Sequence, residues 1–259
     1  MIKLKNYSWT VKHFVLFLTI LFWVACTAPK SVVTQIDGKN IPVDITDTHS
    51  NNLETFIAPY RNHINKDLDN VLAYSPETLD KSKGIWQTNI GNFMADVCLK
   101  EGNRVFEAKE HKKIDFCLLN HGGIRAIIPQ GNVTTRTAFE VMPFENNLFV
   151  TALNGEQVIE MAHYIAEEKK PHPLSGIQII YDQNLQLKAL FIQGKPVEKD
   201  KLYYVATSDY LLHGGDRMNF FLKNKKVYDL NYKIRNILID YFKQVDTLEI
   251  ATDKRIIIE

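Results

Sequence analysis

Two apolar segments in the second half of the chain constrain its fold most. Residues 176–182 (GIQIIYD) and 185–192 (LQLKALFI) both have the composition of strands, and only a short polar turn at Asp182–Asn184 separates them. So short a connection favours an antiparallel hairpin, because parallel neighbours need a crossover of a dozen residues or more. Elsewhere, segments with helical spacing alternate with strand-like segments. The sequence therefore predicts an α+β fold, with a mixed β-sheet and flanking helices.

Hydrophobic spacing and turn residues locate the other elements. In chain order, we expect a helix from Asn51 to Leu72, a helix capped by Thr88 or Asn89 and ending near Gly102, a strand at 114–120, a short helix that starts at Thr134 or Thr135 and ends before Pro143, a strand at 147–155 closed by an Asn-Gly turn, a helix around 158–166, a strand at 201–209, a helix at 234–242 and a strand at 255–258.

The N-terminal region has the composition of a secretory signal. Three lysines precede an apolar run at residues 14–25 (FVLFLTILFWVA), which is short for a bilayer span and ends at Cys26. Ala25-Cys26 is similar to the lipobox of bacterial lipoproteins. Simple cleavage after Ala25 and an uncleaved anchor are the alternatives. We expect the following organisation: a signal peptide at 1–25, lipidation of Cys26, a tether at 26–50 and one domain at 51–259, in an exported, membrane-anchored bacterial lipoprotein of the periplasm or cell surface.

Charge and cysteine content narrow the partners. The chain has 31 Lys and Arg residues against 30 Asp and Glu, a formal net charge of +1. This balance gives no electrostatic reason to expect nucleic acid as a partner. Besides Cys26, the chain holds Cys98 and Cys117, both on apolar segments, where cysteines are more often core thiols than reactive groups. We assign these two no chemistry.

Four short segments concentrate the unusual residues of the chain. They are TNIGN (88–92), NHGGIR (120–125), PFENN (143–147) and YLLHGGD (210–216). Three of them adjoin a strand end, which is where sheet proteins gather their ligands. Two combine a double glycine with a charged side chain, an arrangement that presents backbone N–H groups and a charge to a polar ligand. For NHGGIR alone, an ordinary strand exit with a surface arginine is the alternative.

In this order, the four segments resemble the C-terminal domain of the 5'-nucleotidase family, which binds the nucleoside part of the substrate. The family pattern of NxGN, NxGGIR, PFxN and GGD is present, and the resemblance extends from about Asn51 to the end of the sequence. The chain departs from the pattern at Lys83-Gly84, where members usually carry an arginine. It also departs at Arg217-Met218, where a glycine and an aromatic residue usually follow the aspartate.

The resemblance implies a nucleoside site. By position, Asn120 and Arg125 contact the nucleoside, Phe144 and Tyr210 stack on the two faces of the base, and Asp216 accepts hydrogen bonds from the ribose hydroxyls. Stacking tolerates any base because every base has a π-face. A carboxylate only accepts hydrogen bonds, which suits a diol that has two to donate. The implied substrate-binding set is completed by the glycines of the two turns: Gly122, Gly123, Gly214 and Gly215.

These residues also have plainer interpretations. Taken singly, Phe144 and Tyr210 fit core aromatics, Asp216 fits a cap of the following segment, and Asn120 fits a turn. Asn89 lies at a predicted helix start, where we expect it to brace the neighbouring loops rather than to contact a ligand.

The resemblance covers one of the family's two domains. Full-length members begin with a metallophosphatase domain, which holds two metal ions, carries out the hydrolysis and needs an H-x-H pair among its motifs. Asp47-Thr48-His49 is similar to its D-x-H motif and Asn120-His121 to the start of its Asn-His turn, but the chain has no H-x-H pair. We therefore expect no catalytic residue, metal or other cofactor in this chain, and two divalent metal ions in a partner domain.

The leading hypothesis is the substrate-recognition part of a split 5'-nucleotidase, which acts with a separately encoded metallophosphatase domain to hydrolyse extracellular nucleotides. The alternative is a stand-alone surface lipoprotein that binds a nucleoside or nucleotide without catalysis. A third hypothesis is a metal-dependent phosphatase that uses His49, His121 and His213. A fourth hypothesis is that the fold is retained purely as a module for interaction with other molecules.

Overall fold

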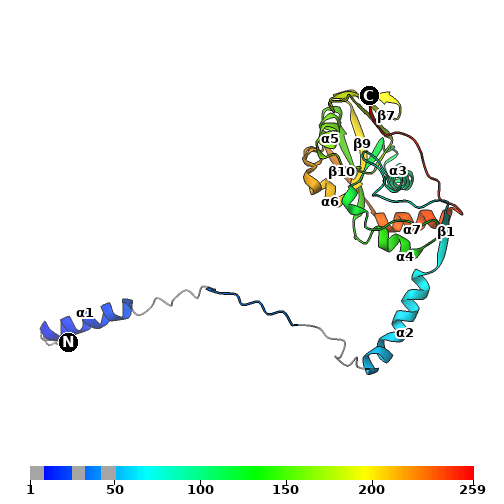
Figure 1. Ribbon diagram of the computed structural model, residues 1–259. Coiled ribbons are helices and arrows are strands. Elements are labelled where there is room, and N and C mark those ends of the chain that lie inside the picture. Colours follow the sequence, from blue (N-terminus) through cyan, green and yellow to red (C-terminus); the bar gives the residue numbers. More distant parts are fainter. Residues whose placement is uncertain (1–8, 25–32, 42–50) are drawn as a thin grey trace. The chain divides into compact units, whose positions relative to one another are not determined.

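The structure, a computed structural model, describes residues 9–24, 33–41 and 51–259 (Figure 1). It divides into two units, residues 1–51 and 52–259. In the first unit, helix α1 (Trp9–Val24) has 16 residues, and residues 33–41 form no regular structure. In the described ranges, no helix combines the length and the apolar character that crossing a membrane requires. Cys26, most of the predicted tether and the Asp47–His49 segment lie outside the described residues.

The elements after α1 interleave helices and strands, which confirms the predicted α+β class. In chain order they are α2 (Asn51–Leu68), β1 (Val71–Ser75), α3 (Asn89–Glu110), β2 (Phe116–Leu118), the 3-10 turn η1 (His121–Gly123), β3 (Gly131–Thr134), α4 (Thr135–Val141), β4 (Asn147–Asn154), α5 (Gly155–Glu168), β5 (Leu174–Ser175), β6 (Ile177–Tyr181), β7 (Leu187–Ile192), β8 (Lys195–Pro196), β9 (Leu202–Ser208), α6 (Asp209–Leu212), η2 (Gly215–Arg217), η3 (Asn219–Lys223), β10 (Lys226–Lys233), α7 (Ile234–Gln244) and β11 (Ile256–Ile258).

The strands after residue 51 form three sheets. The largest has the order β10-β4-β9-β2-β5, in which β2 and β9 are parallel and the other neighbours are antiparallel. The second, β11-β6-β7-β8, contains the predicted hairpin of β6 and β7, with β11 parallel to β6. The third is the antiparallel pair β1-β3. Both larger sheets are therefore mixed, as the sequence predicted.

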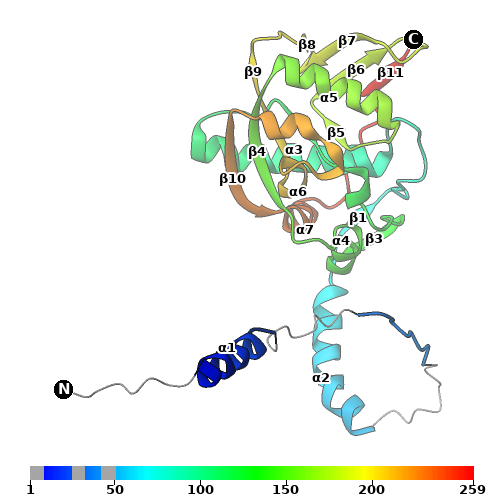
Figure 2. The ribbon, with the colours of Figure 1, turned by 90° about the vertical axis from the view of Figure 1, so that its left-hand side faces the viewer.

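Two hydrophobic cores cover the opposite faces of the five-stranded sheet. Successive residues of a strand point to opposite faces, so in β2 Phe116 and Leu118 join one core and Cys117 the other. The core of Cys117 packs the sheet against α3, α4 and α7, and the core of Phe116 packs it against α5 and the four-stranded sheet. Figure 1 shows α5 and α3 on either side of β9, and Figure 2 shows the four-stranded sheet beyond α5. Cys98 and Cys117 are buried, free thiols, and burial raises the pKa of Cys98 to about 12.

The first predicted helix is too long at its C-terminal end. It ends at Leu68, and Val71 begins β1, where it pairs with Thr134 of β3. The apolar stripe that gave the helical spacing does not face the core. Its members Leu53, Phe56, Tyr60 and Ile64 are each more than half exposed.

Two glycines have roles that differ from the predicted ones. Gly102 does not end α3, which continues to Glu110; a Cβ on Gly102 would lie 2.8 Å from a methyl group of Leu148, so the glycine allows β4 to approach the helix. Asn154-Gly155 closes β4, as predicted, but the pair also starts α5 directly, three residues before the predicted helix. The Asn154 side chain accepts the N–H of Gln157, whose own side chain accepts the N–H of Asn154.

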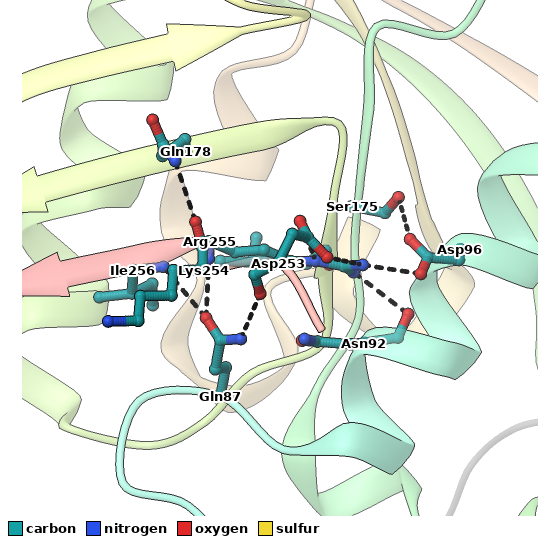
Figure 3. Close-up of polar contacts among 10 residues, drawn as sticks. Gln87, Asn92, Asp96, Ser175, Gln178, Asp253, Lys254, Arg255 and Ile256 are labelled. Carbon is teal, nitrogen blue, oxygen red and sulfur yellow. Dashed lines mark hydrogen bonds and ion pairs between the residues drawn. The ribbon is translucent and has the colours of Figure 1, made fainter. Parts of the chain in front are cut away.

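A buried guanidinium ties the C-terminal strand to α3 (Figure 3). Arg255 is 4 % exposed and donates to the backbone oxygens of Asn92, at 3.1 Å, and Leu174. It also forms ion pairs with Asp96, at 2.7 Å, and Asp253, at 3.1 Å. Because Asn92 and Asp96 lie on α3 and Leu174 on β5, this one side chain joins the segment before β11 to two other elements.

Candidate ligand-binding site

The loops that carry the predicted site residues meet at one edge of the five-stranded sheet. β2 and β9 are parallel, so the turns that follow them, at 120–125 and 209–216, leave the sheet on the same side. β4 is antiparallel to β9 and pairs Leu148 with Ser208. The turn that precedes β4, at 143–146, therefore lies at the same edge. Strand topology brings together three segments that are far apart in the sequence.

A cavity of about 430 Å³ opens between these loops. Its lining residues are Asn120, Gly122, Gly123, Arg125, Phe144, Asn146, Tyr210 and Asp216. All of these except Asn146 were predicted as site residues. The predicted residues Gly214 and Gly215 are not among them. Asn146 was missed, although its place in the PFENN segment was an available signal.

The two aromatic residues of the cavity are not core residues. Phe144 is 41 % exposed and Tyr210 is 46 % exposed, which excludes the interpretation that either is buried packing. The guanidinium of Arg125 lies 5.8 Å from the centroid of the Phe144 ring, within the range of a cation–π contact. Exposed rings that line one cavity can stack on a flat ligand, because aromatic faces attract other π-systems in offset arrangements.

The double glycine of the turn at 209–216 allows the backbone to pack closely against the Tyr210 ring. Gly214 has φ of +82°, and a Cβ on Gly215 would lie 2.6 Å from the Tyr210 ring. The loop therefore folds back closely against that ring. The Tyr210 hydroxyl donates to the Asp216 carboxylate at 2.8 Å and accepts the Asp216 N–H at 3.1 Å. These contacts hold Asp216 and Tyr210 together at the cavity. Gly214 and Gly215 contribute by allowing the backbone to fold closely against the Tyr210 ring, not by lining the cavity.

The Phe144 turn is held from the side of α7. Arg235, 6 % exposed, donates to the backbone oxygens of Pro143, at 3.1 Å, and Phe144, at 3.4 Å. Glu145 forms ion pairs with Lys233 and Arg235. Hydrogen bonds from Lys233 and then Arg235 lower the pKa of Glu145 to about 2, so this carboxylate is charged at neutral pH. The turn is thus attached to the residues that start α7.

A buried histidine holds the glycine turn, and the sequence analysis missed it. His172 is 2 % exposed, and its Nδ1 accepts the N–H of His121 at 3.3 Å. Burial lowers the pKa of His172 to about 4, although the negative charge of Asp216 acts in the opposite direction. The imidazole is therefore neutral at pH 7 and retains the lone pair that accepts this hydrogen bond. No motif surrounds His172 in the sequence, so only the fold reveals it.

The depressed pKa of His172 predicts a loss of stability in acid. Above pH 6.5 the ring is neutral in both states, whereas between pH 6.5 and about 4 only the unfolded state takes up the proton. We expect urea unfolding to show a loss of about 2–3 kcal/mol from this group between pH 7 and 4.5. The side chain of His172→Gln does not titrate, so between pH 7 and 4.5 this variant should lose about 2–3 kcal/mol less free energy of unfolding than the wild type. The exposed His163→Gln is the control, and a pH dependence equal in the His172→Gln and His163→Gln variants would contradict the prediction.

At the two departures from the family pattern, Lys83-Gly84 and Arg217-Met218, nearby charged side chains contact other loops and helices. Lys81 donates to the backbone oxygen of Ile124 at 2.6 Å, at the end of the glycine turn. Arg217 is exposed and pairs with Glu168 on α5, so it does not line the cavity. Asn89 accepts the Asp80 N–H at 2.9 Å and donates to the Thr78 backbone oxygen at 3.1 Å. It therefore braces a loop, as predicted.

The described residues also bear on metal binding. Within them, no group of three or more His, Cys, Asp or Glu side chains is placed to hold a metal ion. His121 and His213 consequently belong to no such group, and His49 lies outside the described part of the chain. Because His49 is outside that part, the hypothesis of a metal-dependent phosphatase built on these three histidines stays a prediction.

Comparison with known proteins establishes the family. Residues 71–223 match the model of the 5'-nucleotidase C-terminal domain, and the chain belongs to this family. Among its curated relatives, the apyrase of Tabanus yao is 26% identical over 188 residues, which cover 65% of this chain and 34% of the apyrase. The 5'-nucleotidase of Vibrio vulnificus is 27% identical over 191 residues, 70% of this chain and 32% of that enzyme. The chain thus spans about a third of the length of these relatives.

Solved structures share the fold. The 5'-nucleotidase precursor of Thermus thermophilus superimposes with a TM-score of 0.66 at 21% identity, over 80% of this chain and 42% of that chain. The NAD nucleotidase of Haemophilus influenzae gives a TM-score of 0.55 at 17% identity, over 82% of this chain and 42% of that chain. Because both identities are below 25%, the similarity to these two structures establishes the fold of this chain and nothing further.

Proposed function

We propose that this chain binds a nucleoside or nucleotide in the cavity at the edge of the five-stranded sheet. The base lies between Phe144 and Tyr210, and the ribose hydroxyls donate to Asp216. One observation carries the proposal: two exposed rings, a carboxylate and a guanidinium line the same cavity, although three separate loops supply them. The names of the relatives, an apyrase and a 5'-nucleotidase, support this class of ligand.

The chemistry of each group fits this ligand. Ring stacking stabilises a bound base by about 1–3 kcal/mol and accepts any base. The carboxylate of Asp216 offers only acceptors, which match the two hydroxyls of a ribose. Asn120 offers both a donor and an acceptor, and Arg125 offers planar donors that suit carbonyl or phosphate oxygens. Selectivity for the sugar is therefore expected to exceed selectivity for the base.

We infer further that a separately encoded metallophosphatase domain, holding two divalent metal ions, performs the hydrolysis. This chain then supplies substrate recognition in a split 5'-nucleotidase that acts on extracellular nucleotides. The family match supports this division of labour: residues 71–223 match the C-terminal domain of the 5'-nucleotidases, and a named 5'-nucleotidase aligns with this chain.

The split-enzyme proposal predicts activation on mixing. Adding the purified chain to the metal-loaded partner domain should raise kcat/KM for AMP by at least about tenfold, because the base and ribose contacts become available to the transition state. Hydrolysis of p-nitrophenyl phosphate, which has neither group, is the control and should not change. Phe144→Ala should abolish most of the activation. If AMP hydrolysis neither accelerates nor changes its specificity, the partnership is wrong.

The alternative function is nucleoside capture without catalysis. Its support is the same set of groups, because stacking on Phe144 and Tyr210 and hydrogen bonding to Asp216 can hold a nucleoside without any chemical step. The two functions predict the same affinity for nucleosides. They differ in the mixing experiment, where a stand-alone binder should leave the hydrolysis of AMP by the partner domain unchanged.

A further inference from the structure

We propose that Asp209 is a positioning residue that fixes the separation between the rings of Phe144 and Tyr210. The inference rests on the proposed function, because it concerns how the same cavity accepts a base. Asp209 does not line the cavity. It lies immediately before Tyr210 at the start of α6, and its carboxylate reaches across to the turn that carries Phe144.

Three hydrogen bonds make this link. Oδ1 of Asp209 accepts the side-chain amide of Asn146 at 2.5 Å and the N–H of Tyr210 at 2.7 Å. Oδ2 accepts the N–H of Asn147 at 3.4 Å. Two of the donors therefore belong to the Phe144 turn and its exit, and the third belongs to Tyr210 itself.

The strand register explains why one side chain can reach both turns. β4 and β9 are antiparallel, and Leu148 pairs with Ser208. The next residue outward on each strand is Asn147 on one side and Asp209 on the other. The Asp209 carboxylate therefore bonds to Asn147 one residue beyond the last backbone pair of β4 and β9, where the two turns leave the sheet.

Each turn also has its own attachment on the far side. The backbone oxygen of Asn146 accepts the N–H of Ile234 at 3.0 Å, and Arg235 holds the turn at Phe144. Tyr210 packs against Gly215. These contacts fix each turn to its own support, whereas Asp209 relates one turn to the other. A shift of either turn changes the gap into which a base must fit, so loss of this link should weaken stacking on both rings.

The chemistry of the site calls for a carboxylate. Three N–H groups converge on two acceptor oxygens, and a carboxylate has no donor of its own. In Asp209→Asn, one oxygen becomes an NH2 group that faces a donor, so at least one of the three bonds is lost without a change in size. This variant is therefore the sharpest test. Asp209→Ser is too short to reach Asn146 and leaves the Ser208 cap of α6 in place. It replaces Asp209→Asn in every arm if that variant does not fold.

A double-mutant cycle separates positioning from general destabilisation. Calorimetry with adenosine should show about a tenfold loss of affinity for Asp209→Asn in the wild-type background. In the Phe144→Ala background, the same substitution should cost less than about twofold, because with one ring removed no ring-to-ring separation remains for Asp209 to fix. Asp182→Asn is the control: Asp182 accepts the N–H groups of Asn184 and Gln186 in the β6–β7 hairpin, and its loss should leave the affinity unchanged. Equal losses in both backgrounds would overturn the proposal.

Amide hydrogen exchange tests the link without any ligand. In the ligand-free protein, the N–H groups of Asn147 and Tyr210 should exchange faster in Asp209→Asn than in the wild type, while protection within β4 is retained. Unchanged exchange at both positions would overturn the proposed link. If the wild-type chain binds no adenosine, the proposed function fails, and the exchange rates alone then decide whether Asp209 joins the two turns.

Discussion

Adenosine binding is expected to weaken about 5- to 150-fold when Phe144 is replaced by alanine, and by a similar factor for Tyr210→Ala, because each ring contributes about 1–3 kcal/mol of stacking. Both rings are more than a third exposed, so their removal leaves no cavity in the core. The loss should therefore appear in affinity and not in stability. Isothermal calorimetry and thermal unfolding of the same samples measure the two effects separately.

Two further variants sharpen this prediction. Tyr210→Phe keeps the ring and removes the hydroxyl that donates to Asp216, so it should lose less affinity than Tyr210→Ala. Tyr60→Ala removes an aromatic side chain of 63 % exposure from α2, away from the cavity, and should bind adenosine as the wild type does. If Phe144→Ala and Tyr60→Ala bind adenosine with equal affinity, the Phe144 ring does not stack on the base.

Arg255→Ala should give the largest loss of stability among the substitutions considered. The side chain is 4 % exposed, and its removal takes the ion-pair partner from the Asp96 carboxylate, which keeps only the Ser175 hydroxyl at 2.6 Å. It also removes a donor from the backbone oxygens of Asn92 and Leu174. Removing one partner of a buried pair typically costs about 3–5 kcal/mol, and the partial exposure of Asp96 reduces this to about 2–4 kcal/mol. We expect a fall in Tm of roughly 5–15 °C by calorimetry or circular dichroism.

Arg136→Ala is the matched control for this prediction. Arg136 forms an ion pair with Asp69 at 2.6 Å, but both side chains are at least a third exposed, so water screens the pair and its loss should lower Tm far less than the loss of Arg255 does. A comparable fall in Tm for the two variants would show that the network around Arg255 does not hold β11 in place. Because Arg255 lies away from the cavity loops, the folded fraction of Arg255→Ala should retain adenosine affinity.

The sequence predicted the fold class from local signals, and it predicted most of the cavity through the resemblance of four motifs to the 5'-nucleotidase C-terminal domain. Period-2 and helical spacing separate strands from helices, and a short polar connection marks the β6–β7 hairpin. The errors came from signals that are ambiguous locally. Asn154-Gly155 suits a separate turn as well as a helix start, so the helix was expected around 158 although α5 begins at Gly155. The apolar residues Val71 and Leu72 continued the helical spacing of α2 although they form β1.

The residues that support the cavity could not be predicted in the same way. His172 and Asp209 lie in no motif, and each acts through hydrogen bonds to a loop that is distant in the sequence, 51 residues away for His172 and 63 for Asp209. The antiparallel pairing of β2 with β5 brings His172 to the glycine turn, and the antiparallel pairing of β4 with β9 brings Asp209 to the Phe144 turn. Sequence patterns thus indicated which side chains line the cavity, and tertiary structure indicated what holds them.

A crystal structure of the chain with adenosine is the measurement that examines the proposed site most directly. We predict that the adenine ring lies between the side chains of Phe144 and Tyr210, with the two ribose hydroxyls within hydrogen-bond distance of the Asp216 carboxylate. Adenosine bound elsewhere on the chain, or bound in this cavity with its ribose turned away from Asp216 and its base off both rings, would contradict it.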